Sequence, residues 1–183
     1  MQKVRVFIMG YKEDEKTAAR KASLITKTLQ PVKDLIEVVC IPEQGAGYEI
    51  YKKAPDCGFQ TSAFHYQEGK FTNRIRHFVV LTRGIEDFGE KAAITKTEAI
   101  KYSDLVIVLS RYPENSSTGK SLKMAEKHLP LKPVIYLEEI KGKLKTNPEK
   151  IPEIIRGIAY EKNKRVYQKP DKRRTWGIPA FGG

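Results

Sequence analysis

The segment DLVIVLSRYPENSSTGKSLKMAEKHLPLKPVIYL, residues 104–137, decides the fold. Residues 105–109 form an unbroken apolar run, which is typical of a strand buried on both faces of a parallel sheet. Leu122, Ala125 and Leu129 then follow at helical spacing and form one apolar stripe. PVIYL (133–137) is a second apolar run. Strand, helix and strand in this order predict two parallel strands joined by a helical crossover.

The rest of the chain repeats this alternation. Further strands are expected at 4–9, 36–41 and 76–82, and further helices at 18–29, 90–102 and 151–158. We therefore predict an α/β fold in which residues 1–160 form a single Rossmann-like domain. Its sheet is expected to be mainly parallel and five-stranded, with helices on both faces. Glycine and proline punctuate residues 42–75, which are expected to form an irregular insertion, a hairpin or a long active-site loop.

Positive charge is concentrated near the C-terminus. The 183 residues carry a net charge of +12, and residues 141–183 hold 12 Lys and Arg against 4 Asp and Glu. We predict a basic C-terminal extension at 161–183, which either contacts nucleic acid or is a solvated surface. Trp176 and Phe181 could anchor it on the domain, on a second subunit or on a partner. The predicted phosphate contacts are Lys164, Arg165, Lys172, Arg173 and Arg174.

Several classes of protein do not fit the composition. No apolar run approaches the roughly 20 residues that a membrane-spanning helix requires, so no membrane partner is expected. Two cysteines, Cys40 and Cys57, make neither a disulfide framework nor a metal set, and the three histidines have no zinc-like spacing. We expect no metal and no cofactor, and a cytoplasmic protein in a reducing compartment. The composition leaves open whether the chain forms a homo-oligomer.

The loop after the fourth expected strand ends in Thr118-Gly119-Lys120-Ser121, as a phosphate-binding P-loop does. A P-loop also needs a glycine five residues before Gly119, because the backbone there wraps closely around a phosphate. Glu114 stands at that position, and its carboxylate would repel a phosphate. The loop also follows the fourth strand, whereas a P-loop usually follows the first. The sequence therefore does not favour a P-loop NTPase.

A ligand site is nevertheless expected where the turn after the first strand, residues 10–12, meets the loop after the fourth strand, residues 110–119. Parallel α/β sheets bind ligands at the carboxyl ends of their strands, where the strand order changes direction. The first turn of a helix offers N–H groups and a dipole that favour an anion or a sugar hydroxyl. The three hydroxyl residues at 116–118 either contact such a ligand or only cap the helix. The predicted nucleotide-binding residues are Gly10, Tyr11, Lys12, Ser110, Asn115, Ser116, Ser117, Thr118, Gly119 and Lys120.

The run EAIKYSDLVIVLSRYPENSSTGKSLKMAEKHLPLKPVIYL resembles the second half of the nucleoside 2-deoxyribosyltransferase family. It is also similar to the related Rossmann-like nucleotide-binding proteins, which include the DNA-processing and LOG phosphoribohydrolase groups. Ser103-Asp104 opens the strand, Gly119 holds the place of the family's glycine, and residues 132–135 open the last strand. The resemblance covers about two thirds of the chain. It implies a Rossmann-like fold, a nucleotide or nucleoside ligand and activity at an N-glycosidic bond.

The chain departs from the deoxyribosyltransferase pattern at the nucleophile. The family carries a glutamate four residues after its glycine, and Lys123 stands there in this chain. Glu126 lies about one helical turn further on, displaced by about 4.5 Å along the axis. The family's Gly-Thr order is also inverted, to Thr118-Gly119. The resemblance therefore implies the fold and the ligand class rather than the transferase activity. The alternative is a catalytically silent module that binds nucleic acid, or a ribonucleoprotein or virion partner, through the basic extension.

Overall fold

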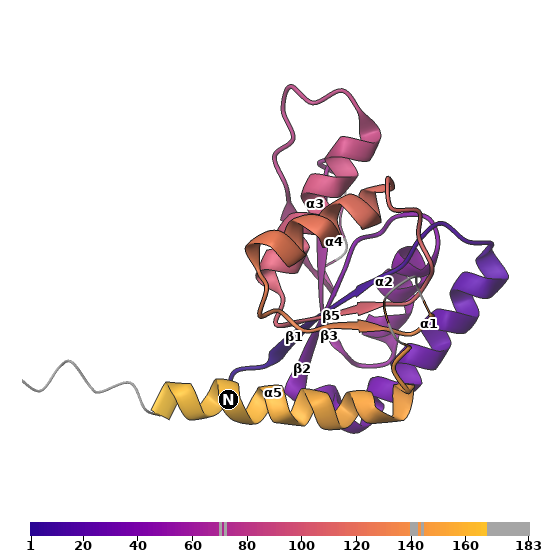
Figure 1. Cartoon of the computed structure of the whole chain (residues 1–183). Coiled ribbons are helices and arrows are strands. Elements are labelled where there is room, and N and C mark those ends of the chain that lie inside the picture. The colour runs from indigo at the N-terminus through magenta and orange to yellow at the C-terminus, as the bar shows by residue number, and fades with distance from the viewer. Residues whose placement is uncertain (70, 72, 140–142, 144, 168–183) are drawn as a thin grey trace, which may run out of the picture.

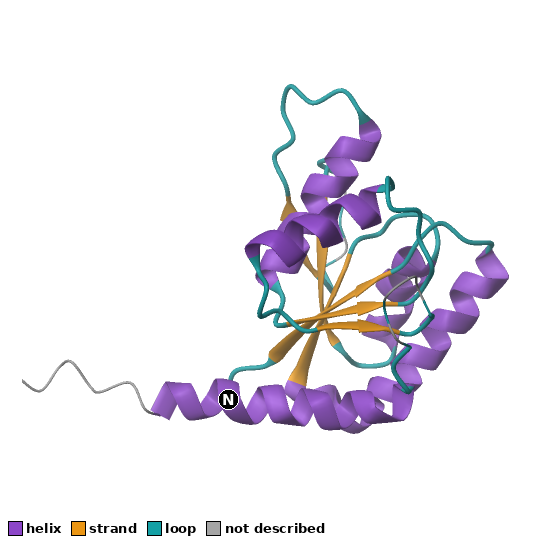
Figure 2. Cartoon of the chain, viewed as in Figure 1, coloured by secondary structure: helices purple, strands orange, loops and turns teal. Residues whose placement is uncertain are grey.

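The structure is a computed structural model that describes residues 1–69, 71, 73–139, 143 and 145–167. It contains one six-stranded sheet in the order β4-β3-β2-β1-β5-β6, and every neighbouring pair is parallel. The predicted α/β fold with a parallel sheet is confirmed (Figure 2). The strands are β1 (Val4–Met9), β2 (Ile36–Cys40), β3 (Gln60–His65), β4 (Arg76–Val79), β5 (Leu105–Val108) and β6 (Val134–Tyr136).

Helices cover both faces of the sheet, as the alternation of the sequence predicts. They are α1 (Glu15–Leu29), α2 (Ala46–Asp56), α3 (Phe88–Tyr102), α4 (Ser117–His128) and α5 (Ile151–Tyr167), with short 3-10 helices at Gln30–Leu35 and Pro148–Lys150. Figure 1 shows α3 and α4 on one side of the sheet and α1 and α5 on the other. The strands supply alternate side chains to the two resulting cores.

The two cores divide the residues of β1 between them. Val4, Val6 and Ile8 pack with buried residues of α1, α2 and α5, whereas Phe7 and Met9 pack with residues of α3 and α4. All five side chains are at most 2 % exposed. A strand buried on both faces reads as a nearly continuous apolar run, which is why β1, interrupted only by Arg5, is recognisable from the sequence.

The sheet has six strands rather than the expected five, and the additional strand lies within residues 42–75. That segment contains α2 and β3, and β3 pairs in parallel with both β2 and β4. A hairpin would have paired its strands antiparallel, so the segment is instead a regular helix-and-strand unit of the fold. The expected strand at 76–82 is also shorter, because β4 ends at Val79.

The strand order changes direction beside β1. Strands β2, β3 and β4 extend from β1 toward one edge, and β5 and β6 extend toward the other. The chain therefore crosses the sheet between β4 and β5, and the carboxyl ends of β1 and β5 become neighbours. This is the position at which the sequence predicts that two distant turns share one crevice.

Candidate functional site

A cavity of about 440 Å³ lies at the carboxyl ends of β1 and β2, beside the N-terminus of α4. The turn after β1 and the first residues of α4 both line it. Thr118 Oγ1 lies 3.5 Å from the carbonyl oxygen of Gly10, so the two segments are in direct contact. The lining residues are Phe7, Ile8, Met9, Gly10, Tyr11, Lys12, Ile41, Pro42, Glu43, Gln44, Gly47, Tyr66, Phe88, Lys96, Ser117 and Thr118.

Gly10 allows the turn after β1 to lie close to the N-terminus of α2. A Cβ atom built at Gly10 would lie 2.8 Å from Ala46 Cβ and 3.4 Å from Ser110 Oγ. Ser110 lies two residues after the end of β5 and is 1 % exposed. Its hydroxyl has no hydrogen-bond partner among the described residues. The predicted residues Gly10 and Ser110 are thus neighbours in space, although one hundred positions separate them in the chain.

An ion pair between α3 and the segment after β2 lines the cavity. Lys96 on α3 is 3 % exposed, and its Nζ pairs with Glu43 Oε2 and donates to Ser117 Oγ at 3.0 Å. Glu43 Oε1 is buried and has no hydrogen-bond donor among the described residues. Glu43 follows β2 and Ser117 begins α4, so Lys96 connects three separate parts of the fold.

Neither Lys96 nor Glu43 is among the residues that the sequence predicts for the site. A signal for Lys96 does exist, because it lies on the buried stripe of α3 together with Ala92, Ala99 and Ile100. A lysine on the apolar side of a helix is seldom fully buried unless it is paired. No comparable signal points to Glu43, which stands in the segment that looked irregular.

Two aromatic side chains form one wall of the cavity. The rings of Tyr66 and Phe88 meet edge to face with their centroids 5.1 Å apart. Phe88 is 59 % exposed, which is unusual for an aromatic residue that packs only within its own domain. Burial raises the pKa of the Tyr66 phenol, and the nearby charge of Glu43 raises it further. These rings and the Glu43 carboxylate therefore lie together.

The hydroxyl residues before and within α4 have different roles. Ser116 caps the helix, because its Oγ accepts from Gly119 N and donates to the carbonyl oxygen of Pro113. Ser117 and Thr118 line the cavity and stand in the first helical turn, where backbone N–H groups have no acceptor within the helix. The structure thus gives a capping role to one hydroxyl and places the other two at the cavity.

The remaining predicted residues of this loop lie outside the cavity lining. Asn115 and Lys120 are exposed, and Lys120 borders a groove between α3 and α4. Gly119 is buried against the loop that precedes it, where a Cβ would lie 2.3 Å from the carbonyl oxygen of Glu114. Its position reflects the close packing of α4 on residues 113–114 rather than an opening toward the cavity.

The family's nucleophile position does not face the cavity. Lys123 forms an exposed ion pair with Glu114 at 3.0 Å. Glu126 pairs with Lys143 at 2.6 Å and lines a separate cavity with Arg111 and Tyr112. Among the described residues, Glu43 is the one carboxylate that lines the cavity beside α4.

The basic C-terminal residues belong partly to α5. This helix continues to Tyr167, so the expected boundary between residues 160 and 161 falls inside it. Lys164 is exposed on the helix, and the backbone of Arg165 belongs to it. Lys172, Arg173 and Arg174 lie outside the described residues.

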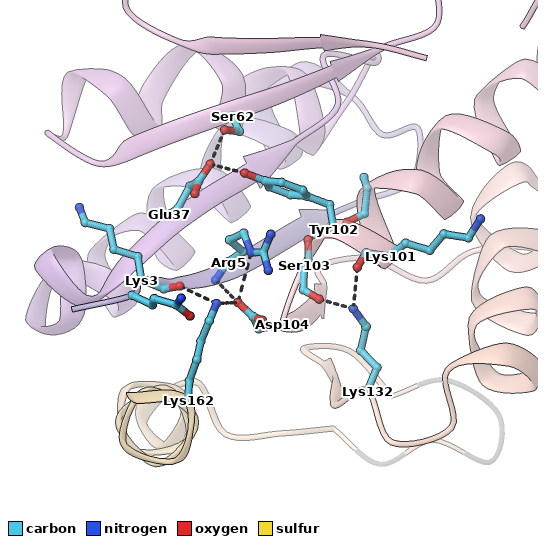
Figure 3. Close-up of polar contacts among 12 residues, drawn as sticks. Lys3, Arg5, Glu37, Ser62, Lys101, Tyr102, Ser103, Asp104, Lys132 and Lys162 are labelled. Carbon is cyan, nitrogen blue, oxygen red and sulfur yellow. Dashed lines mark hydrogen bonds and ion pairs between the residues drawn. The ribbon is translucent and has the colours of Figure 1, made fainter. Parts of the chain in front are cut away.

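The opposite, amino-terminal ends of the strands carry a second polar cluster (Figure 3). Asp104 Oδ2 accepts from Arg5 N at 2.8 Å and from Lys162 Nζ at 2.6 Å. In β2, Glu37 accepts from Ser62 Oγ and, at 3.2 Å, from Tyr102 O–H. These contacts join α5 to β1 and β2 to β3, so the cluster fastens elements together.

Replacement of Asp104 with asparagine is expected to lower the free energy of unfolding at pH 7 by about 2 kcal/mol. Burial raises the pKa of Asp104, but the contacts from Lys162 and Arg5 outweigh it and hold the pKa below its usual value. The carboxylate therefore stabilises the fold above its unfolded pKa of about 4, and this contribution is lost as the pH falls through the lower folded pKa. Urea titrations of both proteins across this pH range measure the difference.

Asp56→Asn provides the control, because the Asp56–Arg74 pair is largely exposed and is expected to contribute at most about 0.5 kcal/mol. A stability difference between Asp104→Asn and the parent that stays constant down to pH 2 would contradict the assignment.

The described residues contain no group of three or more His, Cys, Asp or Glu that could hold a metal ion. Two histidines are nevertheless in contact, with His65 Nε2 and His77 Nδ1 2.9 Å apart. Burial and the neighbouring His77 lower the pKa of His65 to about 4.

Cys40 is fully buried in β2. No helix in the described part of the chain is long and apolar enough to cross a membrane.

Comparison with known proteins identifies the fold but no family. No protein-family model matches the sequence, and the search of curated proteins finds no significant match. Solved structures do match. The molybdenum cofactor binding protein of Rippkaea orientalis has a TM-score of 0.63 and 16 % identity, over 86 % of this chain and 98 % of its own. The molybdenum cofactor carrier protein of Chlamydomonas reinhardtii has a TM-score of 0.53 and 15 % identity, over 91 % of this chain and 98 % of its own.

A third similar structure is DNA processing protein A of Helicobacter pylori, whose single-stranded DNA binding mode is described. It has a TM-score of 0.54 and 14 % identity, over 90 % of this chain and 82 % of its own. Together these structures support a Rossmann-like fold. One of them belongs to the DNA-processing group, which the sequence also resembles. They lend no support to the deoxyribosyltransferase group.

Proposed function

We propose that the protein binds a nucleotide or a similar phosphorylated ligand in the cavity beside α4. The supporting observation is that the turn after β1 and the start of α4 line one cavity at the point where the strand order reverses. Its volume of about 440 Å³ falls within the usual range for small-molecule sites. The similar structures are described as binding a molybdenum cofactor or single-stranded DNA, and both are compatible with a polyanionic or phosphorylated ligand.

The residues that line the cavity favour one orientation of the ligand. The first-turn N–H groups of Ser117 and Thr118 favour a phosphate, and Lys12, an exposed residue that also lines the cavity, can supply a positive charge to it. Tyr66 and Phe88 form the end on which an aromatic ring can stack. A nucleotide lying across the cavity satisfies both ends at once.

Lys12→Ala is expected to weaken the binding of a nucleoside 5′-monophosphate by about tenfold, because one charge-assisted contact to the phosphate is lost. Binding of the corresponding nucleoside should change little, since it has no phosphate. Isothermal titration calorimetry with both ligands measures the two affinities. Lys27→Ala, an exposed lysine on α1, is the control. Equal weakening for nucleotide and nucleoside would contradict the placement of the phosphate.

If the protein cleaves an N-glycosidic bond, Glu43 is the residue that would have to attack it. No carboxylate of α4 lines the cavity, so attack on an anomeric carbon would have to come from Glu43, the one acidic lining residue in the described part of the chain. Its ion pair with Lys96 opposes that role, because the lysine withdraws charge from the attacking group. Ligand binding without bond cleavage is the simpler reading of this geometry.

A second candidate function is the binding of nucleic acid by the basic end of the chain. The uneven distribution of charge favours it, since residues 141–183 carry most of the net positive charge. Deletion of residues 169–183 is expected to lower the salt concentration at which the protein elutes from heparin, because four Lys and Arg are removed. Binding to a short oligonucleotide should weaken steeply with added salt in the full chain. Unchanged elution after the deletion would remove this function from the extension.

A further inference from the structure

The carboxylate of Glu43 is paired on one side only. Its Oε2 atom forms the ion pair with Lys96, whereas its Oε1 atom is buried and lacks a donor among the described residues. The ammonium of Lys96 also donates to Ser117 Oγ, so part of its hydrogen-bonding capacity is already used. A buried acceptor without a donor costs free energy, and native structures rarely leave one. A ligand in the cavity that Glu43 lines can supply this donor.

The position of Glu43 decides which part of a ligand can reach it. Lys96 stands between this carboxylate and Ser117, and so separates its negative charge from the phosphate end of the cavity. Tyr66 and Phe88 line the same cavity as Glu43, and their rings meet edge to face with centroids 5.1 Å apart. A heterocycle stacked on this aromatic pair would therefore direct one of its edges at the carboxylate.

We infer that Glu43 is a specificity residue that selects a heterocycle presenting N–H donors, such as the amino-lactam edge of guanine. This inference rests on the proposed function, because it assumes a nucleotide-like ligand in the same cavity. A carboxylate only accepts hydrogen bonds, so it attracts an edge with donors and repels an edge that offers only acceptors. The pocket thus reads the ligand by its hydrogen-bond pattern as well as by its phosphate.

The test compares three nucleotides on the unaltered protein. Guanosine 5′-monophosphate carries the donors, purine riboside 5′-monophosphate has the same rings, sugar and phosphate without them, and 2′-deoxyguanosine 5′-monophosphate lacks only a sugar hydroxyl. The first is expected to bind about 10- to 100-fold more tightly than the second, the range for one hydrogen bond to a charged group. The third should bind about as tightly as the first.

Glu43→Gln should reduce the preference for the guanine nucleotide to below about fivefold, because a neutral amide makes a weaker bond than a carboxylate. Glu98→Gln makes the same chemical change on α3, at a half-exposed position outside the lining of this cavity, and should keep the full preference. If the Gln variant fails to fold, the ligand series on the unaltered protein decides alone.

The outcomes separate this inference from the proposed function. Equal affinities for all three nucleotides would overturn the role of Glu43 and leave nucleotide binding intact. A loss of affinity on removal of the 2′-hydroxyl, with none on removal of the ring donors, would also overturn it, since the carboxylate would then contact the sugar. No binding of any of the three would overturn the proposed function itself.

Discussion

Gly119→Val is expected to lower the free energy of unfolding by about 3 kcal/mol, the upper part of the range for overpacked sites. A Cβ at Gly119 would lie 2.3 Å from the carbonyl oxygen of Glu114 and 2.8 Å from that of Pro113. Both contacts are with backbone atoms, which cannot rotate away as the end of a flexible side chain can. The start of α4 or the loop before it has to move, and denaturation followed by circular dichroism measures the cost.

Gly157→Ala is the matched control, because Gly157 lies within α5 and a Cβ there would have no atom within 4 Å. This change should raise the stability by up to about 1 kcal/mol through helix propensity. A Gly119→Val protein as stable as the parent would show that the loop yields without strain. The sequence pattern predicts Gly119 as a ligand contact, whereas the structure gives it a packing contact, so any effect of the variant on binding is expected to follow from displacement of α4.

Lys96→Met is expected to cost about 3 kcal/mol, because it leaves the carboxylate of Glu43 buried without its cation. The methionine fills a similar volume, so the loss reports mainly the unpaired charge and not a cavity. Chemical denaturation at pH 7 measures it. The affinity for nucleotides should fall as well, since the lysine also positions Ser117 at the cavity.

Two further variants separate charge from packing in this result. Lys101→Met on the same helix breaks an exposed pair with Glu98 and should cost no more than about 0.5 kcal/mol. The double variant Lys96→Met with Glu43→Gln removes both charges and should recover at least half of the loss. No recovery in the double variant would show that Lys96 contributes through packing alone.

The sequence predicts the elements that are buried by apolar side chains. Strand β5 reads as a continuous apolar run because both of its faces are covered, and β1 and β2 are each interrupted by one charged residue, Arg5 and Glu37. Helix α1 shows its buried stripe at Ala18, Ala22, Ile25 and Leu29. The same logic places both turns at the carboxyl edge of the sheet, because parallel strands all end there, and the strand order then makes β1 and β5 neighbours.

Strand β3 escapes this logic because polar residues occupy its interior. Thr61 and Ser62 are almost fully buried, and their hydroxyls donate to Phe59 O and to the Glu37 carboxylate. Burial of a polar side chain depends on a partner elsewhere in the fold, and a local pattern carries no trace of that partner. The Glu43–Lys96 pair is hidden for the same reason, since its members are 53 positions apart.

The placement of α5 has a consequence for how the chain reaches its native state. Ile151 and Ile155 of α5 complete the core that contains Val4 and Val6, so α5 helps to cover β1, from which it is separated by more than 140 residues. During synthesis, part of this face of the nascent sheet therefore stays exposed until α5 has left the ribosome. Shortened chains that stop before residue 151 should aggregate readily and be sensitive to proteases. Folding should be slow for a chain of this size.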